Sequence, residues 1–410
     1  MRSLHPLAVL LMASSLAACI GSNKSTGSSA PSTPTLNTVT VTIDGGPSGA
    51  TGQINHAYVT LKVCAPASQT ECATIDHVLL DTGSTGLRLV RSVVTAGGVA
   101  LSTTTDTQGQ NVEECVSFGG GQTWGPVVLA DVTLAGEKAA KLPLQLLDDT
   151  ATDAPAPATC GAGGTLINAV AALGANGVLG VGVLAEDCGT ACVAPTTPLP
   201  VYYGCATSGT CSAENIALGA QVANPVSLFV ADNNGIIVSL PALTNANGDS
   251  TVQGELTFGI GTQSDNAMPA AGLTVLGADA NGYFTATYNG GTTVLKALID
   301  SGTDSYALDD SSIATCASGS FVGYFCPAVA PLGVFAVNMG VGAYNGSDTV
   351  DFAIADPSTF VAGAAAFASL GSPGGSGSLT WGMPFFYGRT IYFGIAQRTA
   401  GSFTGPFYAY

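Results

Sequence analysis

The sequence predicts an all-β protein with two similar lobes, and three observations support that prediction. The 410-residue chain is 46% hydrophobic and only 9% charged, with 54 glycines, a composition that favours strands and turns over helices. Short segments alternate apolar and polar residues with a period of two, as half-buried strands do. An apolar segment that runs into an aspartate also occurs twice in the chain.

The alternating segments give the expected strands. Turn-forming clusters such as Asp-Asn-Asn-Gly at 232–235 separate them. Helical candidates are few and short, at 166–173 and 362–368. The expected strands are 58–63, 127–134, 227–230, 236–240, 255–258, 283–288 and 390–393.

The repeated segment is Val-Leu-Leu-Asp-Thr-Gly-Ser at 78–84 and Ala-Leu-Ile-Asp-Ser-Gly-Thr at 297–303. Its aspartates, Asp81 and Asp300, lie 219 positions apart (from 81 to 300). One such tetrapeptide could be only a turn, because Asp, Ser and Gly are common turn residues. Two copies, each after an apolar strand, favour a pair of functional carboxyl groups.

Further elements repeat around both copies. Each copy follows an expected hairpin strand and precedes an apolar-apolar-Gly element, at 178–180 and, in a looser match, at 379–382. A glycine there lets one strand approach the loop that holds the aspartate. Duplication is the simplest account, and we expect an N-terminal lobe at 39–245 and a C-terminal lobe at 246–410.

The first residues indicate export. Residues 1–18 have a positive start and an apolar run too short to span a bilayer, which is typical of a signal peptide. Leu-Ala-Ala-Cys, ending at Cys19, is similar to the lipobox of bacterial lipoproteins; an ordinary signal peptide with an incidental cysteine is the alternative. The resemblance implies a lipidated Cys19, a flexible tether over 19–38 and an anchor in a membrane. Ile20 implies the outer membrane, with the protein facing the periplasm or the cell surface.

Cysteine count and charge agree with export. Without Cys19, ten cysteines remain, enough for five disulfides. No Cys-x-x-Cys pair occurs, so we expect no metal site and no cofactor. A net charge of −17 argues against nucleic acid as a partner. Local pairs Cys64–Cys72, Cys205–Cys211 and Cys316–Cys326 are plausible, while Cys115, Cys160, Cys188 and Cys192 share two bridges in an open pattern.

The two aspartate segments resemble the active-site loops of pepsin-like aspartic peptidases, and more closely an uncharacterised family of bacterial exported proteins with the same pattern. The resemblance implies a bilobal pepsin-like fold with a cleft between the lobes. It covers separate segments within 39–410. Besides the two aspartate loops, these segments are the strand under the first loop at 178–182, the passage between lobes at 224–230 and 254–259, and the closing strands at 381–386 and 390–393.

That family implies a catalytic pair made of Asp81 and Asp300. Two carboxyl groups about 3 Å apart do not both ionise easily, so they share a proton and act together as base and acid on a water molecule. Six neighbours in the loops are expected to support them. Gly83 and Gly302 admit backbone N–H groups, Ser84 and Thr303 donate hydroxyl hydrogen bonds, and Thr82 and Ser301 cross-link the loops.

The hairpin expected to cover the cleft, at 114–126, departs from the family pattern. Phe118 stands where the family has a tyrosine, and Arg88 stands where it has the partnering tryptophan. If Arg88 faces the cleft, its charge favours ionised carboxylates in the pair. The alternative is an ion pair between Arg88 and Glu113 or Glu114.

The tip of this hairpin is rich in glycine. Gly119 and Gly120 make it either a mobile lid or an ordinary hairpin turn. Trp124 either replaces the missing aromatic residue over the substrate or lies in the core. We therefore count Phe118, Gly119, Gly120, Arg88 and Trp124 as candidate substrate-contacting residues.

The leading functional hypothesis is an aspartic endopeptidase of the cell envelope, with an extended polypeptide bound across the cleft. The alternative is an inactive pepsin-fold lipoprotein that acts as a binding or inhibitor module. A third hypothesis, a structural lipoprotein whose two aspartate segments are only turns, predicts no shared cleft.

Overall fold

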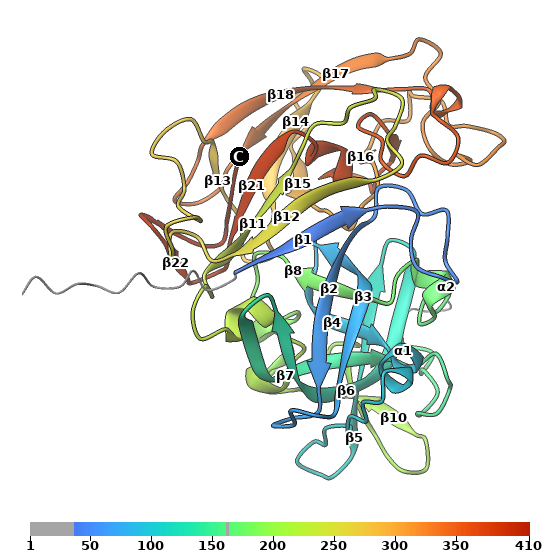
Figure 1. Cartoon of the computed structure of the whole chain (residues 1–410), viewed down its shortest axis with the longest axis vertical. Helices are drawn as coiled ribbons and strands as arrows, with labels where there is room; N and C mark the ends of the chain where they lie inside the picture. Colours follow the sequence, from blue (N-terminus) through green and yellow to red (C-terminus); the bar gives the residue numbers. More distant parts are fainter. Residues whose placement is uncertain (1–36, 161–163) are drawn as a thin grey trace, which may run out of the picture. The chain divides into compact units, whose positions relative to one another are not determined.

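A computed structural model describes residues 37–160 and 164–410, which form one compact unit (Figure 1). The predicted signal peptide, Cys19 and nearly all of the tether lie outside these residues. The predicted boundary between lobes, after residue 245, stays a prediction.

Strands dominate the described residues. The larger sheet contains β1 (Thr38–Ile43), β2 (Ala57–Cys64), β3 (Cys72–Asp81), β4 (Thr85–Val90), β5 (Asn111–Phe118), β6 (Gly121–Leu134), β7 (Glu137–Leu147), β8 (Gly177–Val181), β9 (Tyr202–Cys205), β10 (Cys211–Ala213), β11 (Gly235–Leu240), β12 (Val252–Phe258), β13 (Val275–Gly277), β21 (Arg389–Gly394) and β24 (Phe407–Ala409). The smaller sheet contains β14 (Phe284–Tyr288), β15 (Leu295–Ile299), β16 (Tyr306–Leu308), β17 (Leu332–Met339), β18 (Ser347–Ile354), β19 (Gly371–Pro373) and β20 (Ser378–Trp381). A separate ribbon pairs β22 (Thr399–Ala400) with β23 (Phe403–Thr404).

Helices are short where the structure describes the chain. The two α-helices are α1 (Arg91–Ala96) and α2 (Val170–Leu173), and the 3-10 helices are η1 (Gly189–Cys192), η2 (Leu218–Ala220), η3 (Pro225–Leu228), η4 (Pro357–Thr359) and η5 (Met383–Phe385). None of the described helices is long and apolar enough to cross a membrane.

The same strand motif occurs in both sheets, as the repeated segment predicts. β3 runs into Asp81 and pairs in parallel with β8, which pairs antiparallel with β4. In the second copy, β15 ends just before Asp300 and pairs in parallel with β20, which pairs antiparallel with β16. Hairpins β2–β3 and β14–β15 lead into the two motifs. This arrangement confirms the predicted all-β, bilobal pepsin-like fold.

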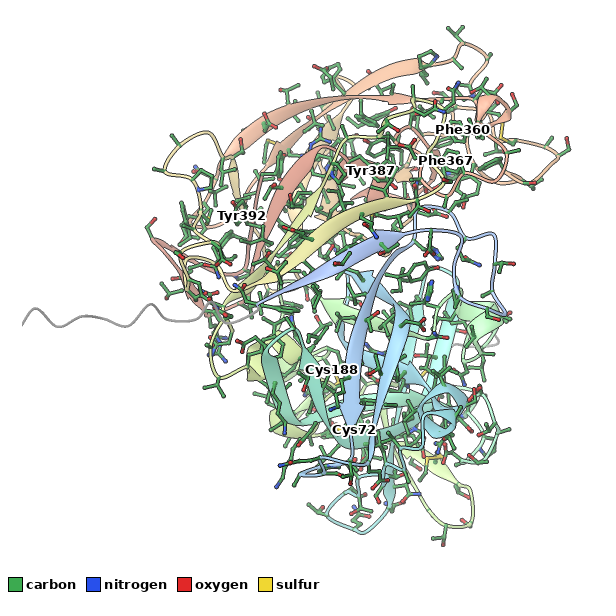
Figure 2. All side chains as sticks on the ribbon, viewed as in Figure 1. Cys72, Cys188, Phe360, Phe367, Tyr387 and Tyr392 are labelled. Atoms are coloured by element: carbon green, nitrogen blue, oxygen red, sulfur yellow. A yellow bond between two sulfur atoms is a disulfide. The ribbon has the colours of Figure 1, made fainter. Side chains whose placement is uncertain are left out.

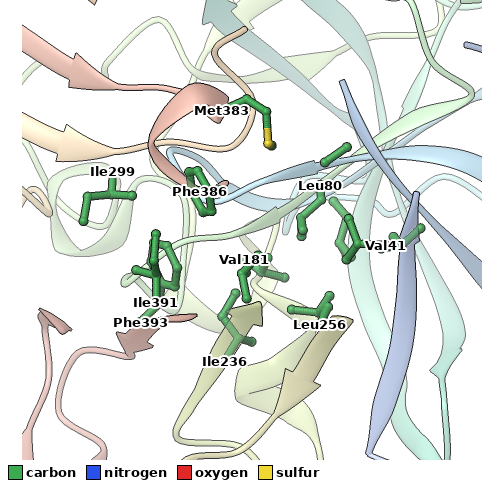
Figure 3. Close-up of a cluster of buried hydrophobic side chains, with 14 of the residues drawn as sticks. Val41, Leu80, Val181, Ile236, Leu256, Ile299, Met383, Phe386, Ile391 and Phe393 are labelled. Carbon is green, nitrogen blue, oxygen red and sulfur yellow. The ribbon is translucent and has the colours of Figure 1, made fainter. Parts of the chain in front are cut away.

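One hydrophobic cluster lies beneath both aspartate segments. Leu80 on β3 and Ile299 on β15 are fully buried members of this cluster, as is Phe386 just after η5 (Figure 3). In such packed interiors, truncation of a leucine or isoleucine to alanine costs about 2–5 kcal/mol. The shared core therefore holds the ends of β3 and β15 firmly in place.

Three local predictions were wrong or incomplete. Segment 227–230 is not a strand, because Pro225 starts the helical turn of η3 and the side chain of Asn224 caps it by accepting the Val226 N–H at 3.0 Å. Segment 362–368 is not a helix, since Gly363 adopts a positive φ of 76° and breaks any helical path. Only 170–173 of the candidate 166–173 is helical.

Five disulfides occur in the described residues. Three are the predicted local pairs, Cys64–Cys72, Cys205–Cys211 and Cys316–Cys326. The four remaining cysteines form Cys115–Cys160 and Cys188–Cys192. Figure 2 labels Cys72 and Cys188 among the side chains. This disulfide content fits an exported protein.

Candidate active site

The two aspartate loops, 81–84 and 300–303, lie against each other. A Cβ atom built on Gly83 would stand 2.4 Å from Cγ of Asp300, and one built on Gly302 would stand 2.7 Å from Cγ of Asp81. Each carboxyl group therefore packs on the glycine of the opposite loop, and only glycine fits at these positions. This contact rules out the hypothesis that the two segments are separate turns.

Each loop holds its own carboxyl group in the same way. Oδ1 of Asp81 accepts the N–H of Gly83 at 2.9 Å and that of Ser84 at 3.1 Å, while Oδ2 accepts the Ser84 hydroxyl at 2.6 Å. In the second loop, Oδ1 of Asp300 accepts the Gly302 N–H at 2.7 Å, and Oδ2 accepts the Thr303 hydroxyl at 2.6 Å. The two carboxyl groups are thereby fixed in orientation.

Thr82 and Ser301 cross-link the loops beneath the carboxyl groups. The Thr82 hydroxyl donates to the Ile299 carbonyl at 3.1 Å and accepts the Ser301 N–H at 2.9 Å. The Ser301 hydroxyl donates to the Leu80 carbonyl at 2.6 Å and accepts the Thr82 N–H at 3.1 Å. Both side chains are buried, so these four hydrogen bonds have no competition from water.

Glycines on the crossing strands let the backbone approach the loops. At Gly182, just past β8, an added Cβ would stand 2.8 Å from the carbonyl oxygens of Thr82 and Ser84. At Gly382, just past β20, it would stand 2.1 Å from the Ser305 carbonyl oxygen. The strand expected under the first loop at 178–182 and the element expected at 379–382 thus lie against the two loops.

The electrostatics favour a shared proton. Burial raises the pKa of Asp81, and the negative charge of Asp300 raises it further, while hydrogen bonds from Ser84 and Gly83 act in the opposite direction; the result is a pKa of about 8. The proton belongs to the pair rather than to one side chain. Such a pair offers one proton donor and one proton acceptor at mildly acidic to neutral pH.

The hairpin expected at 114–126 is present and borders the first loop. β5 and β6 pair down to Phe118 opposite Gly121, so Gly119 and Gly120 form an exposed tip. A pocket of about 500 Å³ lies between this hairpin and the Asp81 loop. Its lining includes Gly83, Ser84, Cys115, Val116 and Ser117. We call residues 114–126 the flap.

Arg88 does not stand free in this pocket. Its side chain is 1% exposed, and Nη2 lies 2.7 Å from Oε1 of Glu114 and 3.2 Å from Oδ2 of Asp187. The structure thus shows the ion pair with Glu114 that the sequence left open. Glu113, the other candidate, instead lies near Asp153 and Arg91, whose charges act on its pKa in opposite directions.

Two carboxyl groups surround the single guanidinium. Burial raises the pKa of Glu114, Arg88 opposes this rise, and Asp187 adds to it. Asp187 also accepts the hydroxyl of Tyr202 at 2.6 Å. Asp187 and Tyr202 lie 99 and 114 positions from Arg88 in the sequence, and no local pattern marks either residue, so neither was predicted.

The structure places Trp124 in the interior and not over the pocket. Its side chain is 2% exposed, its indole N–H donates to the Ala154 carbonyl at 2.7 Å, and its ring packs edge-on against Tyr203. Of the two alternatives for Trp124, the structure supports a place in the core and not contact with a substrate, because the side chain is buried and its polar atom already has a partner.

Within 37–160 and 164–410, no group of three or more His, Cys, Asp or Glu side chains is arranged to hold a metal ion. A second pocket of about 780 Å³ continues from the first and shares Leu184, Asp187 and Cys188 with it. The first pocket borders the Asp81 loop and the second adjoins the first, so together they provide space for an extended ligand.

Comparisons with known proteins agree with this geometry. The family model described as "Protein of unknown function (DUF3443)" matches residues 33–410. Among solved structures, the chain is similar to the crystal structure of an aspartic proteinase from Irpex lacteus, with a TM-score of 0.52 and 15% identity over 91% of this chain and 96% of that chain. At this identity the likeness shows the fold alone. The search of curated proteins found no similar sequence.

Proposed function

The chain belongs to the DUF3443 family of proteins of unknown function, and we propose that it is an aspartic endopeptidase. The observation that carries the proposal is the packing of the Asp81 and Asp300 carboxyl groups, each on the glycine of the opposite loop. The pepsin-like fold supports it, and so does the elevated pKa of Asp81. The pocket beside the Asp81 loop, together with the second pocket that adjoins it, leaves room for an extended polypeptide.

In the proposed reaction, a water molecule lies between the two carboxyl groups. The ionised carboxylate takes a proton from the water as its oxygen attacks the peptide carbonyl carbon, and the protonated carboxyl group gives its proton to the carbonyl oxygen. The tetrahedral intermediate then collapses with cleavage of the C–N bond. The leaving nitrogen receives the proton that the first carboxylate took up, and a hydroxyl group of the intermediate returns a proton to the second carboxylate as the new carbonyl forms, so the pair returns to its original state. Asp81 and Asp300 share these roles.

The location of the protein is also a proposal, supported by the first residues of the sequence and by the disulfides. We propose that the protein is exported and anchored to the outer membrane through a lipid on Cys19. The five disulfides support export. Metabolic labelling with a radioactive fatty acid tests the anchor: the full chain should incorporate label, and Cys19→Ser should abolish incorporation.

Digestion of an unfolded polypeptide tests the proposed activity. The mature chain should cleave reduced, carboxymethylated serum albumin between about pH 3 and pH 7, and a statine-type inhibitor should stop cleavage. Asp81→Asn and Asp300→Asn should each abolish it, whereas the exposed control Asp265→Asn should not. Cleavage by both variants at the wild-type rate would refute the proposal.

A binding or inhibitor module without turnover is the second candidate. Phe118 favours it, because the ring at the end of the flap strand carries no hydroxyl group to hydrogen-bond a substrate. In this case isothermal calorimetry would show the wild type and Asp81→Asn binding a statine-type peptide, while neither protein cleaves any polypeptide.

A further inference from the structure

We propose that Arg88 is the positioning residue of the flap: its buried guanidinium fastens the flap strand to the Asp81 loop through Glu114 and the ring of Phe118. Where it concerns a bound polypeptide, this inference rests on the proposed function. Arg88 neither contacts the catalytic pair nor acts on the reacting atoms. It acts through the flap, which closes one side of the pocket beside the Asp81 loop.

The first connection is to the Asp81 loop. Arg88 lies on β4, which starts directly after that loop. Its Nη1 donates to the Thr85 carbonyl oxygen at 2.8 Å. Thr85 follows Ser84, whose hydroxyl donates to Asp81. The guanidinium is therefore fixed to the same stretch of backbone that orients the carboxyl group of Asp81.

The second connection is to the flap strand. Nη2 donates to Oε1 of Glu114 at 2.7 Å, and the two side chains are 1% and 0% exposed. Charge-assisted hydrogen bonds of this kind are stronger than neutral ones, and their loss leaves a buried polar group without a partner. Glu114 is also held through its carbonyl oxygen, which accepts the amide of Gln145 at 2.6 Å.

The third connection is to the end of the flap strand. The guanidinium carbon lies 5.6 Å from the centroid of the Phe118 ring, within the range of a cation–π contact. Glu114 and Phe118 are four positions apart on β5, so their side chains extend from the same face of the strand. One arginine below that face can thus hold both residues.

Two further groups keep the guanidinium in place. Asp187 lies 3.2 Å from Nη2, and the hydroxyl of Tyr202 donates to Asp187 at 2.6 Å while accepting the N–H of Val222 at 2.8 Å. Tyr202 is fully buried. The guanidinium is consequently held by a second buried carboxylate that is itself fixed by Tyr202, which makes it a rigid anchor and not a mobile surface charge.

Amide hydrogen exchange measures the proposed role directly and needs no catalysis. In the full mature chain, Arg88→Met should speed exchange across the flap by on the order of tenfold, with no change in 284–299 of the β14–β15 hairpin. Arg88→Lys keeps the charge but loses the planar fork, so it should give an intermediate rate. Phe118→Leu removes only the ring contact and should also speed exchange at the flap.

The chain offers a matched control. Arg389 lies with its guanidinium carbon 4.3 Å from the Phe385 ring and donates to a backbone carbonyl, as Arg88 does. Arg389→Met should leave exchange in the flap unchanged. The proposal fails if Arg88→Met leaves flap exchange at the wild-type rate, or if it speeds exchange equally in 284–299. If Arg88→Met does not fold, Phe118→Leu and Arg88→Lys take its place. Flap exchange at the wild-type rate in both of these variants would then overturn the proposal.

Kinetics provide the second readout. With a peptide taken from a cleavage site in serum albumin, Arg88→Met and Phe118→Leu should raise KM about tenfold and keep kcat within about twofold. An unchanged KM together with altered flap exchange would overturn the link to substrate. A wild-type chain that cleaves nothing would refute the proposed function, and the exchange experiment would still test the positioning role of Arg88.

Discussion

Substitution of Gly83 by alanine tests the catalytic pair most sharply. The added Cβ would stand 2.4 Å from Cγ of Asp300 and 2.6 and 2.7 Å from its two oxygens. Those three atoms are its nearest neighbours, and Gly83 needs no positive φ. The substitution therefore acts on the Asp300 carboxyl group and places little strain on the backbone.

The size of the effect follows from these distances. An ordinary contact requires at least 3.4 Å, so the carboxyl group has to move by about 1.0 Å, the difference from 2.4 Å. Such a shift lengthens the 2.7 Å and 2.6 Å hydrogen bonds from Gly302 and Thr303 beyond useful range. A misplacement of about 1 Å costs on the order of 100-fold in rate, or about 2.7 kcal/mol in the barrier.

The assay is kcat/KM for Gly83→Ala at the optimum pH, beside a thermal melt. We expect a loss of about 100-fold in kcat/KM in a variant that still folds, with a lowered melting temperature because the displaced Asp300 carboxyl group loses its hydrogen bonds. Gly333→Ala is the matched control, since Gly333 is exposed, needs no positive φ and has no atom within 4 Å of an added Cβ. A Gly83→Ala enzyme within about threefold of the wild-type kcat/KM would refute the reasoning.

Three further predictions concern stability. Ser301→Ala leaves the Leu80 carbonyl and the Thr82 N–H buried without partners, and should lower the free energy of unfolding by about 2–4 kcal/mol in denaturant titrations. Burial, reinforced by the negative charge of Asp153, raises the pKa of Glu113 from 4.5 to about 8. Between pH 4.5 and about 8 the folded state therefore binds more protons than the unfolded state, so the free energy of unfolding falls as pH rises through this range. In thermal melts at several pH values, the melting temperature of Glu113→Gln should fall less steeply with pH than that of the wild type. Removal of the Cys115–Cys160 disulfide, whose cysteines are 45 positions apart, should cost about 4 kcal/mol by the chain-entropy relation.

Each of these has its own control. Ser239 bonds Thr390 at the surface, and Ser239→Ala should stay within about 0.5 kcal/mol of wild type; an equal loss in both serine variants would contradict the role given to Ser301. Glu255→Gln, at an exposed site, should keep the wild-type pH profile, and an unchanged profile in Glu113→Gln would count against the Glu113 prediction. The short Cys188–Cys192 bridge should contribute about 2 kcal/mol, so a larger loss there than at Cys115–Cys160 would exclude the loop-length argument.

The sequence predicted what depends on local pattern and on the repeat. Two features lie in short segments whose conformation depends on residues nearby in the sequence. They are the apolar strands that lead into Asp81 and Asp300, and the glycines in the crossing strands. The three local disulfides join cysteines within ten positions of each other. Residues that meet only after folding were not predictable in this way. The contact between Arg88 and Asp187 joins residues 99 positions apart, and no periodic pattern in the sequence indicates it.

Two other errors have a shared cause. Segment 227–230 alternates like a strand, but the preceding proline and the cap from Asn224 decide its conformation. Trp124 was a candidate to replace the missing aromatic residue over the substrate, yet it lies in the interior, where the Ala154 carbonyl satisfies its indole N–H. In both cases a specific hydrogen bond outweighed the general preference of the residue type.

The cross-link between Thr82 and Ser301 is reciprocal: each hydroxyl binds the backbone just ahead of the other's aspartate. Exchanging the two loops would reproduce the same set of contacts, which is the defining property of an isologous interface between identical subunits. The hydroxyl groups of Thr82 and Ser301 find these partners in the opposite loop. Half of this molecule on its own would therefore need a second copy of itself to complete these bonds, and a symmetric pair of such halves could form them without any new contact.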